Sequence, residues 1–348
     1  MHSPKNTIVD LIEHEDQTIF HRPDWLSLIE ECYRLGPNHV SVSSNTGSGF
    51  LPLFFVNSPL FGRKLTSQPF NFYGGITASS DTATREILLK AKSLRNEKRA
   101  RYVEIKNVCP LPKEIIDEFQ LIERSPNVRY VVPLQTTSEE FDSKLKRRFR
   151  EKLSGLYRRA KDEGLIISNA GAHDLASLKA FYNILTDEYR IKHFMLPQPF
   201  RLFRLASEIL SERFHLYIAK LNDRMIGGAI VLRDNETDFY LWGAYNQQFD
   251  YLSPLTLILS DAMKAARNAG SKWFDLGVTS RSHEGLNFFK SRWGGICEPL
   301  HYYYIADKPE DVPHLDYFNS FRRARQLIRY VPRPIVQQTS ELVIRWLA

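Results

Sequence analysis

The sequence predicts a mixed α/β protein of two similar halves, each with a central, mostly antiparallel sheet flanked by helices. The chain has 348 residues, more than one hydrophobic core usually organises, so two domains are expected. One order of elements also occurs twice: helices, a strand meander, a helix, a strand, a helix and a strand. Hydrophobic residues at 43% and charged residues at 25% are typical of an ordinary globular protein.

The first half, residues 1–135, opens with a helix that begins at Pro23, because apolar residues recur there at helical spacing. Short strands follow on either side of the turn-forming stretch SSNTGSG, and later strands flank a short acidic-apolar helix. The remaining predicted elements are helices over 82–96 and 113–119, and strands over 39–43, 50–56, 63–66, 102–106 and 128–134.

The second half, residues 136–310, opens with a long basic helix that has a capping-box pattern in Thr137 and Glu140 and ends at Gly164. Another amphipathic helix precedes the stretch RIKHFMLPQPF. Turn residues separate FHLYIAKL, MIGGAIVL and DFYLWGAY, so these segments predict three adjacent antiparallel strands. A helix over 254–268, the strand WFDLG, a short helix and the apolar HYYYI complete this half.

The last segment, residues 311–348, is predicted to be helical, basic and amphipathic. Its apolar residues lie beside Arg322, Arg323, Arg325, Arg329 and Arg333. Such a segment can rest on an anionic membrane, or its apolar face can pack against the second domain. The sequence leaves both open, and the segment is not apolar enough to span a bilayer.

Composition and the N-terminus exclude several classes. Acidic residues interrupt the first twenty positions, where a signal peptide needs an apolar stretch, so we expect a cytoplasmic protein, with peripheral contact at the inner face of the membrane as an option. The scattered Cys32, Cys109 and Cys297 do not predict a disulfide framework or a metal site. A net charge of +7 favours anionic partners, among which we do not expect stable DNA binding.

Five segments carry a family resemblance that covers nearly the whole chain: FGRKLTSQPFNFYGG, RIKHFMLPQPF, IGGAIVL, YLSP and FDLGVTSRSHEGLNFFKSRWGG. They resemble FemAB-like proteins, which attach amino acids to cell-wall precursors and include members associated with bacterial exopolysaccharide systems. The last segment is the most specific, since Asp-x-Gly, Gly-Leu-x-x-Phe-Lys and Trp-Gly-Gly stand in one stretch. The resemblance implies tandem GNAT domains, acyl transfer to an amine, no bound cofactor or metal, and an active cleft mainly in the second half.

Lys290 is the principal catalytic candidate. Attack of an amine on an ester or thioester builds negative charge on a carbonyl oxygen, which a cation stabilises. The pair Phe289 and Lys290 resembles the family's Phe-Lys pair, which assigns Phe289 to the donor pocket. Without that motif, Lys290 would be interpreted as a solvated helix residue and Phe289 as ordinary core.

The attacking amine must lose a proton, and three nearby groups are candidates for the base: Asp275, His283 and Glu284. Asp275 ends a predicted strand, where α/β sites often lie, although it can equally cap the following turn. We place Asp275 among the catalytic candidates and Glu284 among the substrate-binding ones. Gly294 and Gly295 favour either a close backbone approach to substrate or a turn.

Basic residues are candidates for phosphate recognition. Arg63, Lys64 and Arg281 would bind a nucleotide-linked precursor. A second cluster on the basic helix would contact tRNA, although its members point around the helix, as on a solvated surface. They are Lys144, Lys146, Arg147, Arg148, Arg150, Lys152, Arg158, Arg159 and Lys161.

Aromatic and loop residues give the remaining candidates. Tyr240, Trp242 and Tyr245 alternate on one predicted strand, which indicates one packed face, and Tyr245 is kept as a substrate-binding candidate. The following QQFDYLSP lacks the Gly-rich turn that holds the CoA pyrophosphate in acetyl-CoA-dependent GNAT proteins. Ser253 instead precedes a helix whose N-terminus can face an anion.

We therefore expect an enzyme that transfers an aminoacyl or acyl group to an amine of a peptidoglycan or exopolysaccharide precursor, with aminoacyl-tRNA as the favoured donor. One alternative is an acyl-CoA-dependent N-acyltransferase acting on a sugar or lipid amine. The other is a non-catalytic binding protein that retains the fold.

Overall fold

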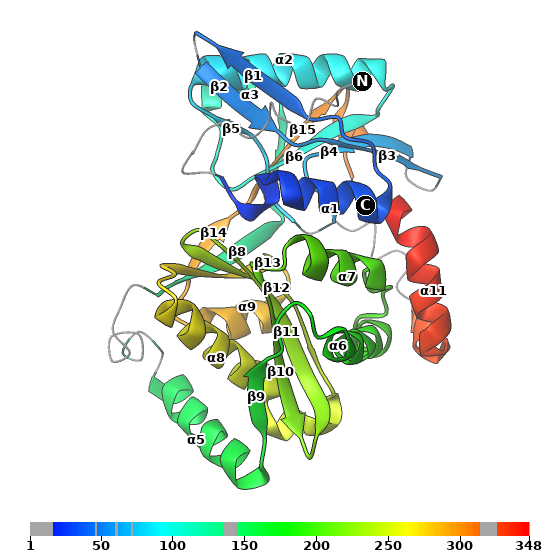
Figure 1. Cartoon of the computed structure of the whole chain (residues 1–348). Helices are drawn as coiled ribbons and strands as arrows, with labels where there is room; N and C mark the ends of the chain where they lie inside the picture. Colours follow the sequence, from blue (N-terminus) through cyan, green and yellow to red (C-terminus); the bar gives the residue numbers. More distant parts are fainter. Residues whose placement is uncertain are drawn as a thin grey trace. The chain divides into compact units, whose positions relative to one another are not determined.

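The computed structural model describes residues 17–45, 47–59, 62–70, 72–134, 143, 145, 147–313 and 326–347 (Figure 1). These residues form two compact units. The first comprises residues up to 126 together with 299–313 and 343–347, and the second comprises 127–298 and 326–342. The predicted capping box at Thr137 and Glu140 lies outside the described residues.

The first unit contains two sheets, in the strand orders β1-β2-β5 and β3-β4-β6-β15-β7. Its strands are β1 (Val40–Ser44), β2 (Gly47–Leu51), β3 (Phe54–Ser58), β4 (Gly62–Thr66), β5 (Thr77–Ala78), β6 (Tyr102–Asn107), β7 (Ile122–Arg124) and β15 (His301–Ala306). Its helices and short helical turns (η) are η1 (Ile19–His21), α1 (Pro23–Tyr33), α2 (Asp81–Glu97), α3 (Lys113–Glu118), η4 (Pro309–Asp311) and η7 (Ile344–Leu347).

Helix α2 follows the prediction because its start and its apolar face are both encoded locally. The Ser80 hydroxyl caps it by accepting from the Ala83 amide at 3.1 Å. Its buried face, including Ile87, packs in the core of this unit. The single strand predicted over 50–56 was wrong, because Pro52, which has no N–H to donate, separates β2 from β3.

The second unit is built on one seven-stranded sheet in the order β14-β8-β13-β12-β11-β10-β9. The strands are β8 (Asn127–Pro133), β9 (Ile166–Asn169), β10 (Phe214–Leu221), β11 (Arg224–Asp234), β12 (Thr237–Tyr245), β13 (Trp273–Ser280) and β14 (Ile296–Pro299). The helices and turns are α5 (Arg147–Glu163), α6 (Leu175–Glu188), η2 (Tyr189–His193), α7 (Phe200–Ile209), η3 (Gln247–Leu252), α8 (Pro254–Asn268), α9 (Glu284–Ser291), η6 (Leu327–Tyr330) and α11 (Arg333–Val343).

The predicted meander is confirmed, since β10, β11 and β12 pair antiparallel in sequence order. Helices α5 and α8 bury their apolar residues in one core cluster on this sheet, whereas α6 packs on β11 and β12 from the other side (Figure 1). Gly228 permits the close approach of α6, because a Cβ there would lie 2.6 Å from Phe181 Cδ2. Helix α7 was not predicted, although Leu202, Phe203 and Ala206 follow helical spacing.

Two strands pair away from their neighbours in the chain. β8, which ends the first half in sequence order, pairs antiparallel with β13 of the second unit. β15, which ends the second half in sequence order, pairs antiparallel with β6 of the first unit. Each unit therefore completes its sheet with a strand from the other half of the sequence.

Tyr240 and Trp242 do not share one packed face, contrary to the sequence interpretation. The pairing of β11 with β12 shifts register between Ile230 and Val231, so Leu241 is an extra residue in β12. Such a bulge reverses the alternation of side chains along a strand. Tyr240 consequently packs against the α5 and α8 core, and the Trp242 ring lies 5.0 Å from that of Phe203 on α7.

The basic residues of α5 lie on its exposed surface, while Phe149, Leu153, Leu156 and Ala160 are buried. Gly164 follows with φ +74°, so the predicted helix end is confirmed. Lys144, Lys146, Arg322, Arg323 and Arg325 lie outside the described residues. No helix within the described part of the chain is long and apolar enough to cross a membrane.

The Gly228 contact gives a stability prediction. Gly228→Ala should lower the free energy of unfolding by about 1–3 kcal/mol, because the added methyl group meets the fully buried Phe181 ring. Gly155→Ala is the matched control: its Cβ meets nothing within 4 Å, so a better helix former in α5 should raise stability by up to about 1 kcal/mol. Urea unfolding followed by circular dichroism measures both, and an equal effect of the two changes would contradict the packing argument.

Candidate active site

The seven-stranded sheet opens between β12 and β13. These parallel strands pair at three positions, Thr237 with Trp273, Asp238 with Phe274, and Phe239 with Asp275. Beyond Asp275, β13 continues to pair on its other side with β8, after a register shift between Asp275 and Val278. Backbone groups of β13 that face the opening lose their partner strand, and buried backbone carbonyls need another donor.

Lys290 supplies that donor. It lies in the last turn of α9 with only 3% of its surface exposed. Its Nζ donates to the carbonyl oxygens of Gly277 at 2.8 Å and Val278 at 3.2 Å. Burial lowers the pKa of Lys290 to about 7, although the negative charge of Asp275 opposes that shift. The predicted cation is therefore a buried group in the sheet opening rather than a solvated helix residue.

Asp275 is fully buried below this opening, with 1% of its surface exposed. Its Oδ1 accepts from the Gly277 amide at 2.7 Å, where the glycine has φ +75°. Its Oδ2 lies 3.6 Å from Arg129 Nη1 on β8, and Arg129 Nε donates to Glu298 at 2.7 Å. Asp275 therefore does not end its strand, as the sequence predicted: β13 continues to Ser280, and the carboxylate holds the irregular backbone at Gly277 inside β13 while it also faces two cations.

Arg129 and Glu298 were not singled out in the sequence. A signal existed for Arg129, because it is a charged residue inside the apolar strand segment VRYVVPL. Its partner could not be inferred, since β8 and β13 are far apart in the chain and their pairing has no local signature.

Four further candidates lie on or just before α9. Phe289 is half-buried against the core of the unit, with its ring 6.4 Å from that of Trp293. Glu284 and Arg281 are exposed, and the Arg281 carbonyl accepts from Asn287 Nδ2 at 3.2 Å. His283 caps α9 through Nδ1, which accepts from the Leu286 amide at 3.2 Å.

The Trp-Gly-Gly motif is explained by packing. Trp293 is buried, and its ring lies 4.9 Å from that of Phe149 on α5. Gly294 has φ +72°, and a Cβ on Gly295 would lie 3.2 Å from Val132 of β8. These glycines make the turn into β14 and its close approach to β8, which favours the turn interpretation.

Tyr245 and Ser253 both form hydrogen bonds to Asp250. Tyr245 ends β12, and its hydroxyl donates to Asp250 Oδ1 at 2.7 Å. Ser253, at φ +48°, donates its amide to the Asp250 carbonyl at 2.8 Å. Helix α8 then starts at Pro254, as predicted. In place of a glycine-rich turn, the chain forms the short helical turn η3.

Glu188, at the end of α6, was not singled out in the sequence. Its Oε2 accepts from the Tyr245 amide at 3.1 Å, and its Oε1 lies 3.1 Å from Lys192 Nζ and 3.7 Å from His193 Nε2. Burial raises the pKa of Glu188, but His193, Lys192 and the Tyr245 amide together hold it below its usual value. The π-helical turn η2, Tyr189–His193, therefore places Lys192 and His193 beside Glu188 at the end of β12.

Arg63 and Lys64 belong to the first unit, on β4, and are not part of this cluster in the second unit. Arg63 is exposed. Burial lowers the pKa of Lys64, and the charge of Glu104 opposes that effect. The first unit has its own three-residue parallel pairing, of β4 with β6, so the strand arrangement of the opening occurs in both units.

Residues 147–291 match the family model of the acetyltransferase (GNAT) domain. This chain carries a GNAT acyltransferase domain. The match includes both strands of the opening and all of α9, so Lys290 and Asp275 lie within the GNAT domain. A comparison with curated proteins finds no match.

Solved structures extend the similarity to both units. FemX has 15% identity with a TM-score of 0.67, covering 90% of this chain and 96% of FemX. The C-terminal domain of an Agrobacterium fabrum protein described as a lysylphosphatidylglycerol synthetase has 13% identity and a TM-score of 0.58, covering 87% and 91% of the two chains. L-PGS from Bacillus licheniformis has 11% identity and a TM-score of 0.56, covering 88% and 97%. The expected mixed α/β fold, FemAB-like in that it is shared with FemX over both units, is confirmed, and the GNAT match lies in the second unit.

In the part of the chain that the structure describes, no group of three or more His, Cys, Asp or Glu residues is arranged to hold a metal ion.

The lowered pKa of Lys290 predicts a pH-dependent stability. Between pH about 7 and 10.5, the unfolded chain binds a proton on this lysine that the folded chain has released, so stability rises with pH. Lys290→Met should reduce this slope by up to about 1.4 kcal/mol per pH unit. Urea unfolding of both proteins across this range measures it, and identical pH dependences would show that Lys290 titrates normally.

Proposed function

We propose that this GNAT acyltransferase transfers an aminoacyl or acyl group to an amine of a cell-envelope precursor, with Lys290 as the catalytic cation. The supporting observation is the buried Lys290 ammonium, held by two backbone carbonyls where β12 and β13 separate. An ammonium has three N–H bonds. Two point to Gly277 and Val278, which leaves one to donate to a substrate.

The reaction forms a bond between the acceptor nitrogen and the acyl carbon, and it breaks the C–O bond of an ester donor or the C–S bond of a thioester donor. The nitrogen gives up a proton, and the leaving group takes up a proton. Negative charge on the carbonyl oxygen develops during attack, and a preorganised cation in a buried site stabilises it strongly. In this scheme Phe289, Tyr245, Ser253, Glu284 and Arg281 contact the substrates, and Arg63 of the first unit is kept as a separate candidate for phosphate binding.

Asp275 and Arg129 are assigned positioning roles. Asp275 fixes the backbone at the β13 irregularity around Gly277, whose carbonyl accepts from Lys290, and its charge favours the protonated lysine. Arg129 faces the same carboxylate from β8. Because Asp275 is buried in these contacts, it acts through Lys290 in this proposal rather than by taking the proton from the amine.

The cell-envelope acceptor is supported by the FemAB-like motifs and by the shared fold with FemX and with the protein described as a lysylphosphatidylglycerol synthetase. Aminoacyl-tRNA is the proposed donor. The loop before α8 lacks the glycine-rich turn of acetyl-CoA enzymes, and the exposed arginines and lysines of α5 suit a phosphate backbone. An acyl-CoA donor is the second candidate, since the matching family model is that of an acetyltransferase domain.

A donor screen tests the proposal. Purified protein would be incubated with labelled charged tRNAs or labelled acyl-CoAs, and with a bacterial cell-envelope precursor extract as acceptor. We expect label to move to the precursor fraction from charged tRNA. Transfer only from acyl-CoA would replace the donor, and no transfer from either class would favour a non-catalytic binding protein.

Substitution of Lys290 separates catalysis from structure. Lys290→Met keeps much of the buried volume and should lower kcat by about 10²–10³-fold, with substrate binding retained. Single-turnover transfer and donor binding measure the two effects. A Lys290→Met protein that is folded and retains full activity would mean that the lysine only satisfies the carbonyls of β13.

A further inference from the structure

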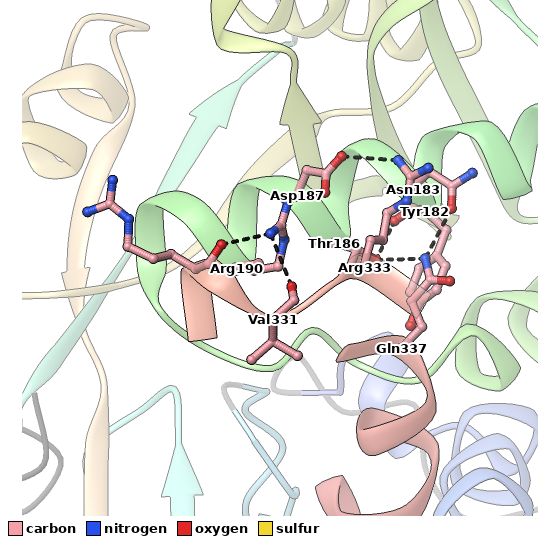
Figure 2. Close-up of polar contacts among 9 residues, drawn as sticks. Tyr182, Asn183, Thr186, Asp187, Arg190, Val331, Arg333 and Gln337 are labelled. Carbon is pink, nitrogen blue, oxygen red and sulfur yellow. Dashed lines mark hydrogen bonds and ion pairs between the residues drawn. The ribbon is translucent and has the colours of Figure 1, made fainter. Parts of the chain in front are cut away.

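The C-terminal segment is fastened to the second unit by side chains of α6 and η2 (Figure 2). Arg190 Nη1 donates to the carbonyls of Arg329 at 2.8 Å and Val331 at 3.1 Å, while its Nη2 donates to Asp187 at 3.1 Å. Arg333 donates to the other oxygen of Asp187 at 3.1 Å. Both ends of the turn between η6 and α11 are thereby tied to the end of α6.

Helix α11 continues the attachment. Gln337 Nε2 donates to Asn183 Oδ1 at 3.0 Å and Thr186 Oγ1 at 3.2 Å on α6 (Figure 2). Val336 and Ser340, one turn apart on α11, are fully buried. Of the two arrangements that the sequence left open, the structure shows the packed one for this face of the segment.

The same segment also carries exposed apolar side chains. Leu327, Tyr330, Ile335 and Leu342 expose 66%, 76%, 51% and 62% of their surfaces. Ile335 and Leu342 are seven residues apart on α11, so they lie on the same side of the helix. Turn η2, which contacts η6, adds the exposed Ile191, and Met195 is exposed just after it. Half of the twelve large exposed apolar residues in the described chain thus come from η2, η6 and α11 and their immediate flank.

The charges of these segments are positive on balance, because the described ranges 187–195 and 326–347 contain five arginine and lysine residues and three carboxylates. Lys192, Arg329 and Arg333 are exposed, whereas Glu341 is the one exposed carboxylate in the described ranges 187–195 and 326–347. Asp187 and Glu188 are half-buried and paired with Arg190, Arg333 and Lys192. The Arg329 guanidinium lies 5.3 Å from the Tyr330 ring centroid, so a cation and an amphipathic aromatic ring stand side by side.

We propose that the surface formed by Ile191, Met195, Leu327, Tyr330, Ile335 and Leu342 docks on an anionic lipid bilayer, with Arg329 and Lys192 beside the headgroups. Apolar side chains flanked by cations match the boundary between acyl chains and anionic headgroups. Tyrosine suits the same boundary, because its ring is apolar and its hydroxyl is polar. The proposal rests on the proposed function in one respect: it takes the acceptor to be located at the membrane.

Docking on this surface would hold the GNAT domain itself at the bilayer. The contacts of Arg190, Arg333 and Gln337 fix the segment to α6. The same helix ends at Glu188, which binds the Tyr245 amide at the end of β12. A lipid-linked acceptor at the membrane would therefore be concentrated at the domain that acts on it.

Vesicle cosedimentation of the full chain tests the docking surface, using phosphatidylcholine vesicles with and without phosphatidylglycerol. We expect binding that requires phosphatidylglycerol and weakens with added salt. The double variant Leu327→Glu and Tyr330→Glu should reduce bound protein at least tenfold, to about the level of the phosphatidylcholine control. Leu89→Glu with Leu175→Glu is the matched control: it adds the same charge at exposed leucines on α2 and α6 and should bind as the wild type does.

Thermal unfolding would establish that both double variants are folded, and Arg329→Gln should give an intermediate loss of binding. Absence of binding to phosphatidylglycerol vesicles, equal binding to both vesicle types, or an equal loss in the control variant would each overturn the proposal. A concentration-dependent dimer abolished by the Leu327 and Tyr330 changes would assign the surface to a second copy instead. Vesicle binding needs neither donor nor acceptor, so its outcome is independent of the transfer assay.

Discussion

The hydrogen bonds from Lys290 to Gly277 and Val278 allow the sheet of the second unit to open without leaving carbonyl oxygens unpaired. Where two parallel strands separate, they lose the hydrogen bonds between them. Each buried polar group left without a partner lowers the stability of the fold by about 1–3 kcal/mol. Asp275 completes the arrangement by binding the Gly277 amide. The opening of the sheet, the irregular backbone at Gly277 and the burial of the ammonium therefore depend on one another. The proposed catalytic lysine also stabilises the fold.

The first unit shows another way to accommodate the same divergence of strands. β4 and β6 pair at three positions, as β12 and β13 do. There the buried Lys106 donates from Nζ to the carbonyls of Gln68 at 2.7 Å and Phe70 at 2.8 Å, and Gln68 in turn binds the Phe20 carbonyl. A lysine satisfies backbone carbonyls in both units, but in the first unit they belong to the segment that follows β4. This similarity supports the interpretation of the chain as two related units.

Locally encoded features were predictable from the sequence. The 254–268 helix begins at a proline and ends before a glycine, the β10–β12 meander has turn residues at its corners, and Lys290 stands in a specific motif. Features that depend on distant pairing were not. The extra residue Leu241 is visible only in the register with β11, and the Arg129–Asp275 contact exists only because β8 joins β13. Glu188 was missed for a similar reason, since its partner Tyr245 is reached through the packing of α6 on β12.

The exchange of β8 and β15 also limits how the protein can be divided. A cut between the two sequence halves would separate β13 from the strand that carries Arg129, and β6 from its antiparallel neighbour β15. Both resulting fragments would expose an unpaired strand edge, and such edges favour aggregation. Neither half can therefore be moved to another protein as a contiguous gene segment unless a sheet is rebuilt to replace the strand left behind.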